Sequence, residues 1–190
     1  MASKPGERKQ QTFQALADML EQPHAARITT AALATRLQIS EAALYRHFAS
    51  KAQIFEGLID FTEQSIFTLI DQIAELEPNG VLQARKIATM LLTFAERNKG
   101  ITCVLTGDAL VTEDNLLQER ANHPNDRIEA SFRQSLQIAV NEGGLLPTTN
   151  VDAYATVLTH FVISQWLRYA QSGWQMTPTL HVEAQLAVVL

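Results

Sequence analysis

Hydrophobic residues recur every three or four positions along most of the chain, which is the spacing of one face of an α-helix. The first such segment runs from about Glu7 to Glu21, and Pro23 ends it. Alternating runs of apolar and polar residues, the pattern of strands, are weak throughout the sequence. The pattern therefore predicts an all-α protein.

Two short helices are predicted after the first one. The pair Thr29-Thr30 supplies hydroxyl side chains that suit the N-terminal cap of a helix, and Leu33 and Leu37 give that helix an apolar face. Ser40 is a suitable cap for the next helix, which we expect to span about Glu41 to Phe48.

A long helix follows Ser50 and continues until Pro78, where a Pro-Asn-Gly sequence ends it. Its apolar residues form one inner stripe, and Leu69 belongs to that stripe. At 100° per residue, Phe61 points about 120° away from the stripe. Phe61 is therefore predicted to lie off the core-facing side of this helix.

The second half of the chain predicts further helices, and the one from Val81 to about Arg97 is apolar around most of its circumference. Wide apolar faces on the last two segments exceed what one small bundle needs to cover, so we expect them to form a homodimer interface. The remaining predicted segments are Ile101 to Thr106, Asp108 to Asn122, about Asp126 to Asn141 after a break at Pro124, and about Val151 to Ser172.

Composition limits the class of protein. The chain has 190 residues, of which 46% are hydrophobic and 18% are charged, and this excludes a disordered or fibrous chain. The longest stretch without a charged residue, Ala153 to Leu167, is too short and too polar to cross a bilayer, and the N-terminus lacks the apolar core of a signal peptide. Cys103 is the only cysteine, so no internal disulfide can form. We expect a cytoplasmic protein.

Charge is distributed unevenly along the chain. Residues 1–52 hold seven Lys or Arg against four Asp or Glu, whereas the remaining residues hold eight against 16. Phosphates respond to local charge within about 10 Å at moderate salt, so an acidic whole does not exclude nucleic-acid binding by a basic segment. The uneven charge distribution predicts a basic N-terminal segment and an acidic remainder of the chain.

Residues 29–48 have the length and pattern of a helix-turn-helix. Small residues at the start of its second helix let the backbone approach bases in the major groove, and polar residues around them can contact phosphates. The predicted base-facing residues are Ser40, Ala42 and Ala43, and the predicted phosphate contacts are Thr29, Thr30, Tyr45, Arg46, His47 and Lys51, with a direct contact to a base left open for Arg46.

The run RITTAALATRLQISEAALYRHFASKAQIF resembles the DNA-binding head of the TetR family. The resemblance implies a head over residues 1–52 and a helical dimerisation and partner-binding body over residues 53–190. Gln38 stands in the turn where relatives often have Gly, and a non-Gly residue with positive φ costs about 1 kcal/mol.

The body resembles one branch of that family, on the runs SEAALYRHFASKAQIFEGLIDFTEQSI and AERNKGITCVLTGDALVTEDNLLQERAN. Members of this branch bind palindromic chromosomal sites and restrain assembly of the division protein FtsZ over the nucleoid. The resemblance implies the same partners, DNA and FtsZ, with FtsZ contacting Phe61, Arg97 and Asn98. Leu69 occupies a position where a basic residue is familiar in this branch.

Two other classes of function are alternatives to this one. A ligand-controlled repressor would share every feature of the head, and a small molecule would release it from DNA. An enzyme is disfavoured because the sequence lacks the common nucleotide-binding, hydrolase and metalloprotease motifs. Neither a cofactor nor a metal is expected, since the histidines, including His24 and His123, have no partners at ligand spacing.

Overall fold

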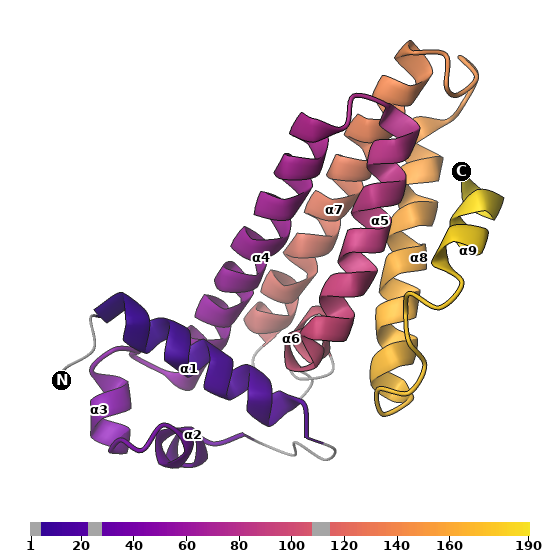
Figure 1. The fold of residues 1–190 in the computed structure, drawn as a ribbon. Helices are drawn as coiled ribbons and strands as arrows, with labels where there is room; N and C mark the ends of the chain where they lie inside the picture. Colours follow the sequence, from indigo (N-terminus) through magenta and orange to yellow (C-terminus); the bar gives the residue numbers. More distant parts are fainter. Residues whose placement is uncertain (1–4, 23–27, 108–114) are drawn as a thin grey trace. The chain divides into compact units, whose positions relative to one another are not determined.

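The structure is a computed structural model that describes residues 5–22, 28–107 and 115–190. Within these ranges the chain forms helices and turns and no strand (Figure 1), so the all-α prediction is confirmed. The helices are α1 (Pro5–Leu20), α2 (Thr30–Arg36), α3 (Glu41–Tyr45), α4 (Lys51–Leu76), α5 (Gly80–Arg97), α6 (Lys99–Leu105), α7 (Asn115–Asn141), α8 (Val151–Gln171) and α9 (Val182–Val189).

The chain forms two compact units. Unit 1 comprises residues 1–62 and 98–121, and unit 2 comprises residues 63–97 and 122–190. Helix α4 contributes its first half to unit 1 and its second half to unit 2, and the chain then returns to unit 1 through α6.

Unit 1 contains α1, α2, α3, α6 and the start of α4. Helix α1 packs on both α2 and α6, and Gly100 of α6 allows a close approach because its hydrogen faces the backbone carbonyl of Ala17. Phe13 of α1 makes an edge contact with the ring of Phe48, with the ring centroids 5.8 Å apart. The buried apolar residues of this unit include Leu16, Leu20, Leu33, Leu44, Ile54, Phe55 and Leu58.

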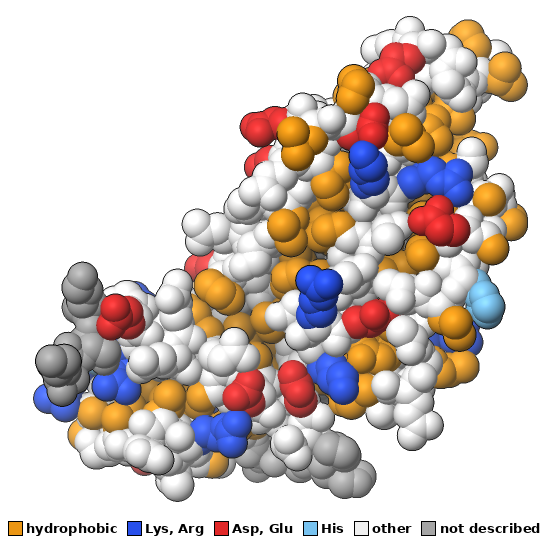
Figure 2. Space-filling view, viewed as in Figure 1, with side chains coloured by type: hydrophobic (Ala, Val, Ile, Leu, Met, Phe, Trp, Pro, Cys, Tyr) orange, Lys and Arg blue, Asp and Glu red, His pale blue; other side chains and the backbone are white. Residues whose placement is uncertain are grey.

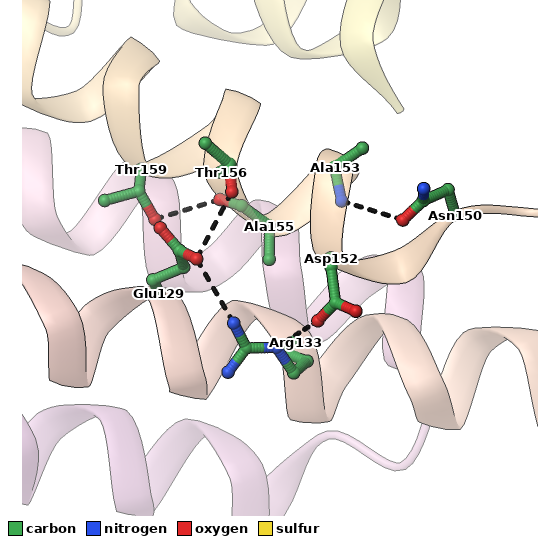
Figure 3. Close-up of polar contacts among 8 residues, drawn as sticks. All are labelled: Glu129, Arg133, Asn150, Asp152, Ala153, Ala155, Thr156 and Thr159. Atoms are coloured by element: carbon green, nitrogen blue, oxygen red, sulfur yellow. Dashed lines mark hydrogen bonds and ion pairs between the residues drawn. The ribbon is translucent and has the colours of Figure 1, made fainter.

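Unit 2 contains the second half of α4 together with α5, α8, α9 and most of α7, which run side by side in Figure 1. Trp166 of α8 is fully buried, and its indole N–H donates a hydrogen bond of 3.1 Å to the carbonyl of Leu91 in α5. A polar network at the surface joins α7 to α8: Arg133 contacts Asp152 at 2.5 Å and Glu129 at 3.2 Å (Figure 3). Apolar packing and these ion pairs together fix α8 against its neighbours.

Pro124 lies inside α7 and does not separate two helices, so the predicted break there is wrong. A proline in a helix removes one hydrogen bond and crowds the carbonyl four residues earlier, at a cost of about 3 kcal/mol. Pro124 is buried, as are Ile128, Phe132 and Leu136 at successive four-residue intervals. Burial of this continuous stripe outweighs the local cost. Of the predicted Asp108 to Asn122 segment, residues 108–114 lie outside the described ranges.

Three other predicted boundaries and faces need correction. Helix α3 ends at Tyr45 and not at Phe48, and beyond it the N–H groups of His47 and Phe48 both bond to the carbonyl of Leu44, while the Phe48 ring is buried. Leu69 is 37% exposed, whereas Phe67 is buried, since α4 meets different neighbours along its length. Helix α9 was not predicted at all; it is short, and its sequence is apolar around most of the helix.

The apolar faces that were expected to form the dimer interface lie largely in the core of unit 2. Ile128, Phe132, Leu136 and Leu158 are each no more than 1% exposed within a single chain. They form the core of unit 2 and cannot also be the surface that a second chain covers. Apolar side chains do reach the surface of the molecule (Figure 2), and on α8 these are Tyr154 and Val157, at 36% and 52% exposed. Within the described ranges, no helix combines the length and apolar character needed to span a membrane.

Candidate nucleic-acid interface

The helix-turn-helix is built by local hydrogen bonds that the sequence specifies. The hydroxyl of Thr29 accepts a 3.1 Å hydrogen bond from the N–H of Ala32, and the hydroxyl of Ser40 accepts one of 3.2 Å from the N–H of Ala43. These bonds satisfy N–H groups that have no partner within the helices α2 and α3. Both predicted caps are therefore confirmed.

The turn between α2 and α3 contains Gln38 in a left-handed conformation, with φ of 55°. The N–H of Ile39 bonds back to the carbonyl of Ala34 at 3.0 Å and closes the turn. Leu33 and Leu44 are buried on either side of it. The turn has the geometry that a glycine would adopt more easily, and packing of the two leucines compensates for the strain.

The predicted base-facing residues lie at the exposed start of α3. Ser40 and Ala42 are exposed, and Ala43 is half-buried. Their small side chains leave the backbone of this end of α3 open to a close approach. Such a surface suits contact with base edges, including the methyl group of thymine.

The predicted phosphate contacts surround this surface. Tyr45, Arg46 and His47 follow one another at the end of α3 and are all exposed. Lys51 begins α4 and is half-buried, with its ammonium nitrogen 5.6 Å from the centre of the Phe55 ring. These residues follow the recognition helix or begin the next helix, and they supply two cations, one histidine and one phenol.

One residue of this surface was missed by sequence reasoning. Glu41 is the first residue of α3, and its carboxylate accepts a hydrogen bond of 2.5 Å from the hydroxyl of Thr30. The phenol oxygen of Tyr45 lies 3.3 Å from the same Thr30 hydroxyl. The available signal was an acidic residue among small ones at the start of a recognition helix.

The proposed partner residues are divided between the two units. Phe61 and Asn98 belong to unit 1, and Arg97 belongs to unit 2. Arg97 is exposed at the end of α5, while the backbone carbonyl of Asn98 accepts hydrogen bonds from Thr102 at the start of α6. Phe61 is half-buried, with its ring centroid 6.1 Å from that of Phe13. Phe61 therefore supports the packing of α1 as well as offering a partly exposed ring.

One of the described histidines pairs with a carboxylate. Among the described residues, no group of three or more His, Cys, Asp or Glu side chains is placed to hold a metal ion. His123 instead lies 2.9 Å from the carboxylate of Glu63, which joins α7 to α4 within unit 2. Its interpretation as an isolated histidine is thus wrong. His24 lies outside the described residues.

A cleft of about 330 Å³ lies in unit 2 between α4, α5 and α7. Asp71 and Glu75 of α4 and the polar side chains Gln83 and Gln134 contribute to its lining. Two carboxylates at such a cleft disfavour an anionic ligand. The cleft therefore does not resemble a site for a fatty acid or a phosphorylated cofactor.

Two family models match the chain. One, described as bacterial regulatory proteins of the tetR family, matches residues 15–58, and the other, a tetracyclin repressor-like C-terminal domain of the SlmA-like type, matches residues 79–190. The first match covers the helix-turn-helix and the second covers most of unit 2.

Solved structures of TetR regulators share the fold at low sequence identity. The fatty acid degradation regulator FadR from Bacillus halodurans superposes with a TM-score of 0.85 at 11% identity, covering 99% of this chain and 97% of that one. A TetR transcription regulator from Haloarcula marismortui gives a TM-score of 0.83 at 11% identity, with 97% and 96% covered.

Relatives that carry the name of a function are much more similar to this chain in sequence than these solved structures are. The nucleoid occlusion factor SlmA of Marinomonas sp. is 43% identical over 178 residues, which are 94% of this chain and 90% of the relative. The same factor of Idiomarina loihiensis is 41% identical over 189 residues, covering 100% and 96%, and that of Vibrio cholerae is 41% identical over 184 residues, covering 96% and 93%. These proteins are DNA-binding regulators and not enzymes, which agrees with the sequence prediction. The chain belongs to the TetR family of bacterial regulators and, within it, to the group of SlmA nucleoid occlusion factors.

Proposed function

We propose that the protein is a nucleoid occlusion factor that binds palindromic chromosomal sites as a homodimer and restrains FtsZ assembly over the nucleoid. In the dimer, two copies of α3 would enter successive major grooves about one helical turn of DNA, or roughly 34 Å, apart. The small surface of Ser40, Ala42 and Ala43 would face the bases. The protein would thus act at the nucleoid.

The observation that carries the DNA-binding part is the helix-turn-helix of unit 1. Its recognition helix begins with small exposed residues, and exposed or half-buried polar and cationic residues follow within two turns. Phosphate contacts position a protein on DNA, and base contacts give sequence preference. We assign the first role to Thr29, Thr30, Tyr45, His47 and Lys51, with Arg46 serving either role.

We place the contact with FtsZ at Phe61, Arg97 and Asn98. Support for this comes from the resemblance of these segments to the SlmA group and from the exposure of Arg97. An arginine and a partly exposed aromatic ring are residue types that often dominate protein interfaces. If DNA binding alters the affinity for FtsZ, the effect must be reciprocal, because a coupling free energy is shared by both ligands.

A ligand-released repressor is the competing proposal and has less support. The structures of FadR regulators share the fold with this chain at identities of 10–15%, which speaks for the fold alone. The acidic lining of the cleft in unit 2 also disfavours anionic acyl ligands.

The test separates the two activities by substitution. Tyr45→Ala is expected to weaken binding to a genomic duplex while leaving the pull-down of FtsZ intact in the absence of DNA. Arg97→Asp is expected to abolish the pull-down of FtsZ and leave the DNA affinity near that of the wild type. Arg97 is exposed, so its substitution should change the free energy of unfolding by no more than about 0.5 kcal/mol.

Lys86→Asp is the matched control, because Lys86 is another exposed cation on the same helix, α5. This variant should retain both activities. Retention of FtsZ by Arg97→Asp would show that the partner surface lies elsewhere. Absence of FtsZ binding by the wild type, combined with release of DNA by a small molecule, would favour the competing proposal.

A further inference from the structure

A short chain of hydrogen bonds at the start of α3 ends on a carboxylate. Thr30 has one hydroxyl hydrogen, and the structure gives it to the carboxylate of Glu41 at 2.5 Å. The phenol of Tyr45, 3.3 Å from the Thr30 oxygen, must then be the donor in that second contact. The hydrogens of both hydroxyls are therefore directed along a path that ends on Glu41.

This arrangement conflicts with phosphate binding by the same two residues. A phosphate oxygen only accepts hydrogen bonds, so Thr30 and Tyr45 can bind it only by turning their hydrogens away from Glu41. A phosphate would also stand close to the exposed carboxylate of Glu41, and two anions repel each other. When Thr30 and Tyr45 contact a DNA phosphate, the Glu41 carboxylate thus loses the hydrogen bond from Thr30 and lies beside the negative charge of that phosphate.

The major groove offers a new donor for this carboxylate. Glu41 lies between Ser40 and Ala42, the residues proposed to face the bases, and its side chain is exposed there. Among base edges in the major groove, the exocyclic amino group of cytosine is the donor that a carboxylate matches. A site with cytosine at the right position would replace the bond that Glu41 gives up, whereas the N7 acceptor beside the amino group of adenine would repel the carboxylate.

We propose that Glu41 is a specificity-determining residue that reads a cytosine in each half-site. It holds Thr30 and Tyr45 away from phosphates in the free protein and releases them where its carboxylate can bind that amino group. Non-specific DNA, which lacks this compensation, is disfavoured. The inference rests on the proposed DNA-binding function and adds to it the base class that one residue recognises.

The test measures affinity by fluorescence anisotropy for a duplex selected from genomic fragments by the wild-type protein, for a scrambled duplex, and for single-base variants of the selected site. Glu41→Ala is expected to lower the ratio of selected to scrambled affinity by about tenfold and to abolish the preference at one C·G pair of each half-site. Preferences at the other positions should remain. Glu41→Gln, which keeps the size of the side chain, is expected to shift the preferred base at that position from cytosine to adenine.

Glu56→Ala is the control, since Glu56 is an exposed carboxylate of α4 in the same unit and lies outside the hydrogen-bonded trio. It should retain every base preference. The proposal is overturned if Glu41→Ala keeps all base preferences, whether its affinity for both duplexes rises, falls or stays the same. A wild-type protein that binds the selected and scrambled duplexes equally would overturn the DNA-binding function as well, so the two failures are distinguishable.

Discussion

At the scale of single residues, Glu77 shows how a neighbouring cation lowers the pKa of a carboxyl group. The Lys86 ammonium lies 2.6 Å from the Glu77 carboxylate and holds the pKa of that carboxyl below its ordinary value, with help from the backbone N–H of Asn79 at 3.1 Å. A lowered pKa in the folded state means that the pair adds stability above the ordinary pKa of glutamate. That contribution is lost as the pH falls through the lowered pKa.

Lys86→Ala tests this pair. The pKa of Glu77 is expected to rise toward that of an ordinary glutamate, because its strongest hydrogen bond and the nearby positive charge are both removed. Carboxyl carbon shifts followed by NMR during an acid titration measure the change, and Arg168→Ala serves as a control that should leave Glu77 unaffected. An unchanged pKa in Lys86→Ala would contradict the assignment of the cause.

At the scale of elements, the approach of α6 to α1 depends on a residue without a side chain. A Cβ atom at Gly100 would overlap the backbone carbonyl of Ala17, and neither backbone can move aside without disturbing its own helix. At Gly6, near the start of α1, the described residues place no side chain and no backbone atom from outside that helical turn within 4 Å of the position that a Cβ would take. Gly6 and Gly100 therefore have different roles.

Gly100→Ala is expected to lower the free energy of unfolding by at least about 2 kcal/mol, through overpacking between α6 and α1. Gly6→Ala should be neutral or stabilise by up to about 1 kcal/mol, because alanine restricts the unfolded chain and favours a helix. Urea unfolding followed by circular dichroism measures both. Equal free energies of unfolding of the two variants would mean that α1 and α6 can move apart without loss of stability, which would contradict this account of Gly100.

At the scale of the whole molecule, family membership implies a dimer, and the structure limits where its interface can lie. Leu158 is fully buried within one chain, while the adjacent Val157 is 52% exposed on α8. Tyr154, one turn earlier, is 36% exposed. We place the dimer contact on this outer face of α8, together with the exposed side of α7.

Val157→Arg is expected to give a folded monomer, because the new charge would be buried only in the dimer. Leu158→Arg should instead unfold or aggregate, since its charge would be buried in the core of unit 2. Leu82→Arg, at an exposed apolar position of α5, is the control that should remain dimeric. Light scattering at micromolar concentration distinguishes the three, and a dimeric Val157→Arg would exclude this face.

The sequence by itself determined the features that depend on neighbours within about four residues. Thr29 and Ser40 cap the starts of α2 and α3 because each hydroxyl accepts a hydrogen bond from the N–H three residues ahead. Both partners lie within a few residues of each other, so the sequence alone predicts these caps. The helical periodicity, the basic character of residues 1–52 and the helix-turn-helix pattern are local in the same sense. The fold class followed from them, and the family followed from the resemblance of residues 27–55 to the DNA-binding head of the TetR family.

Only the tertiary structure decided what depends on which elements meet. Pro124 is tolerated inside α7 because the helix buries a continuous stripe, and Leu69 faces solvent because α4 changes neighbours along its length. The chain from Tyr45 through Thr30 to Glu41 joins residues 11 and 15 positions apart. Local sequence determines which segments form helices. Burial and contacts of this kind arise only when distant segments pack together. Apolar periodicity alone therefore could not distinguish a core face from a dimer face.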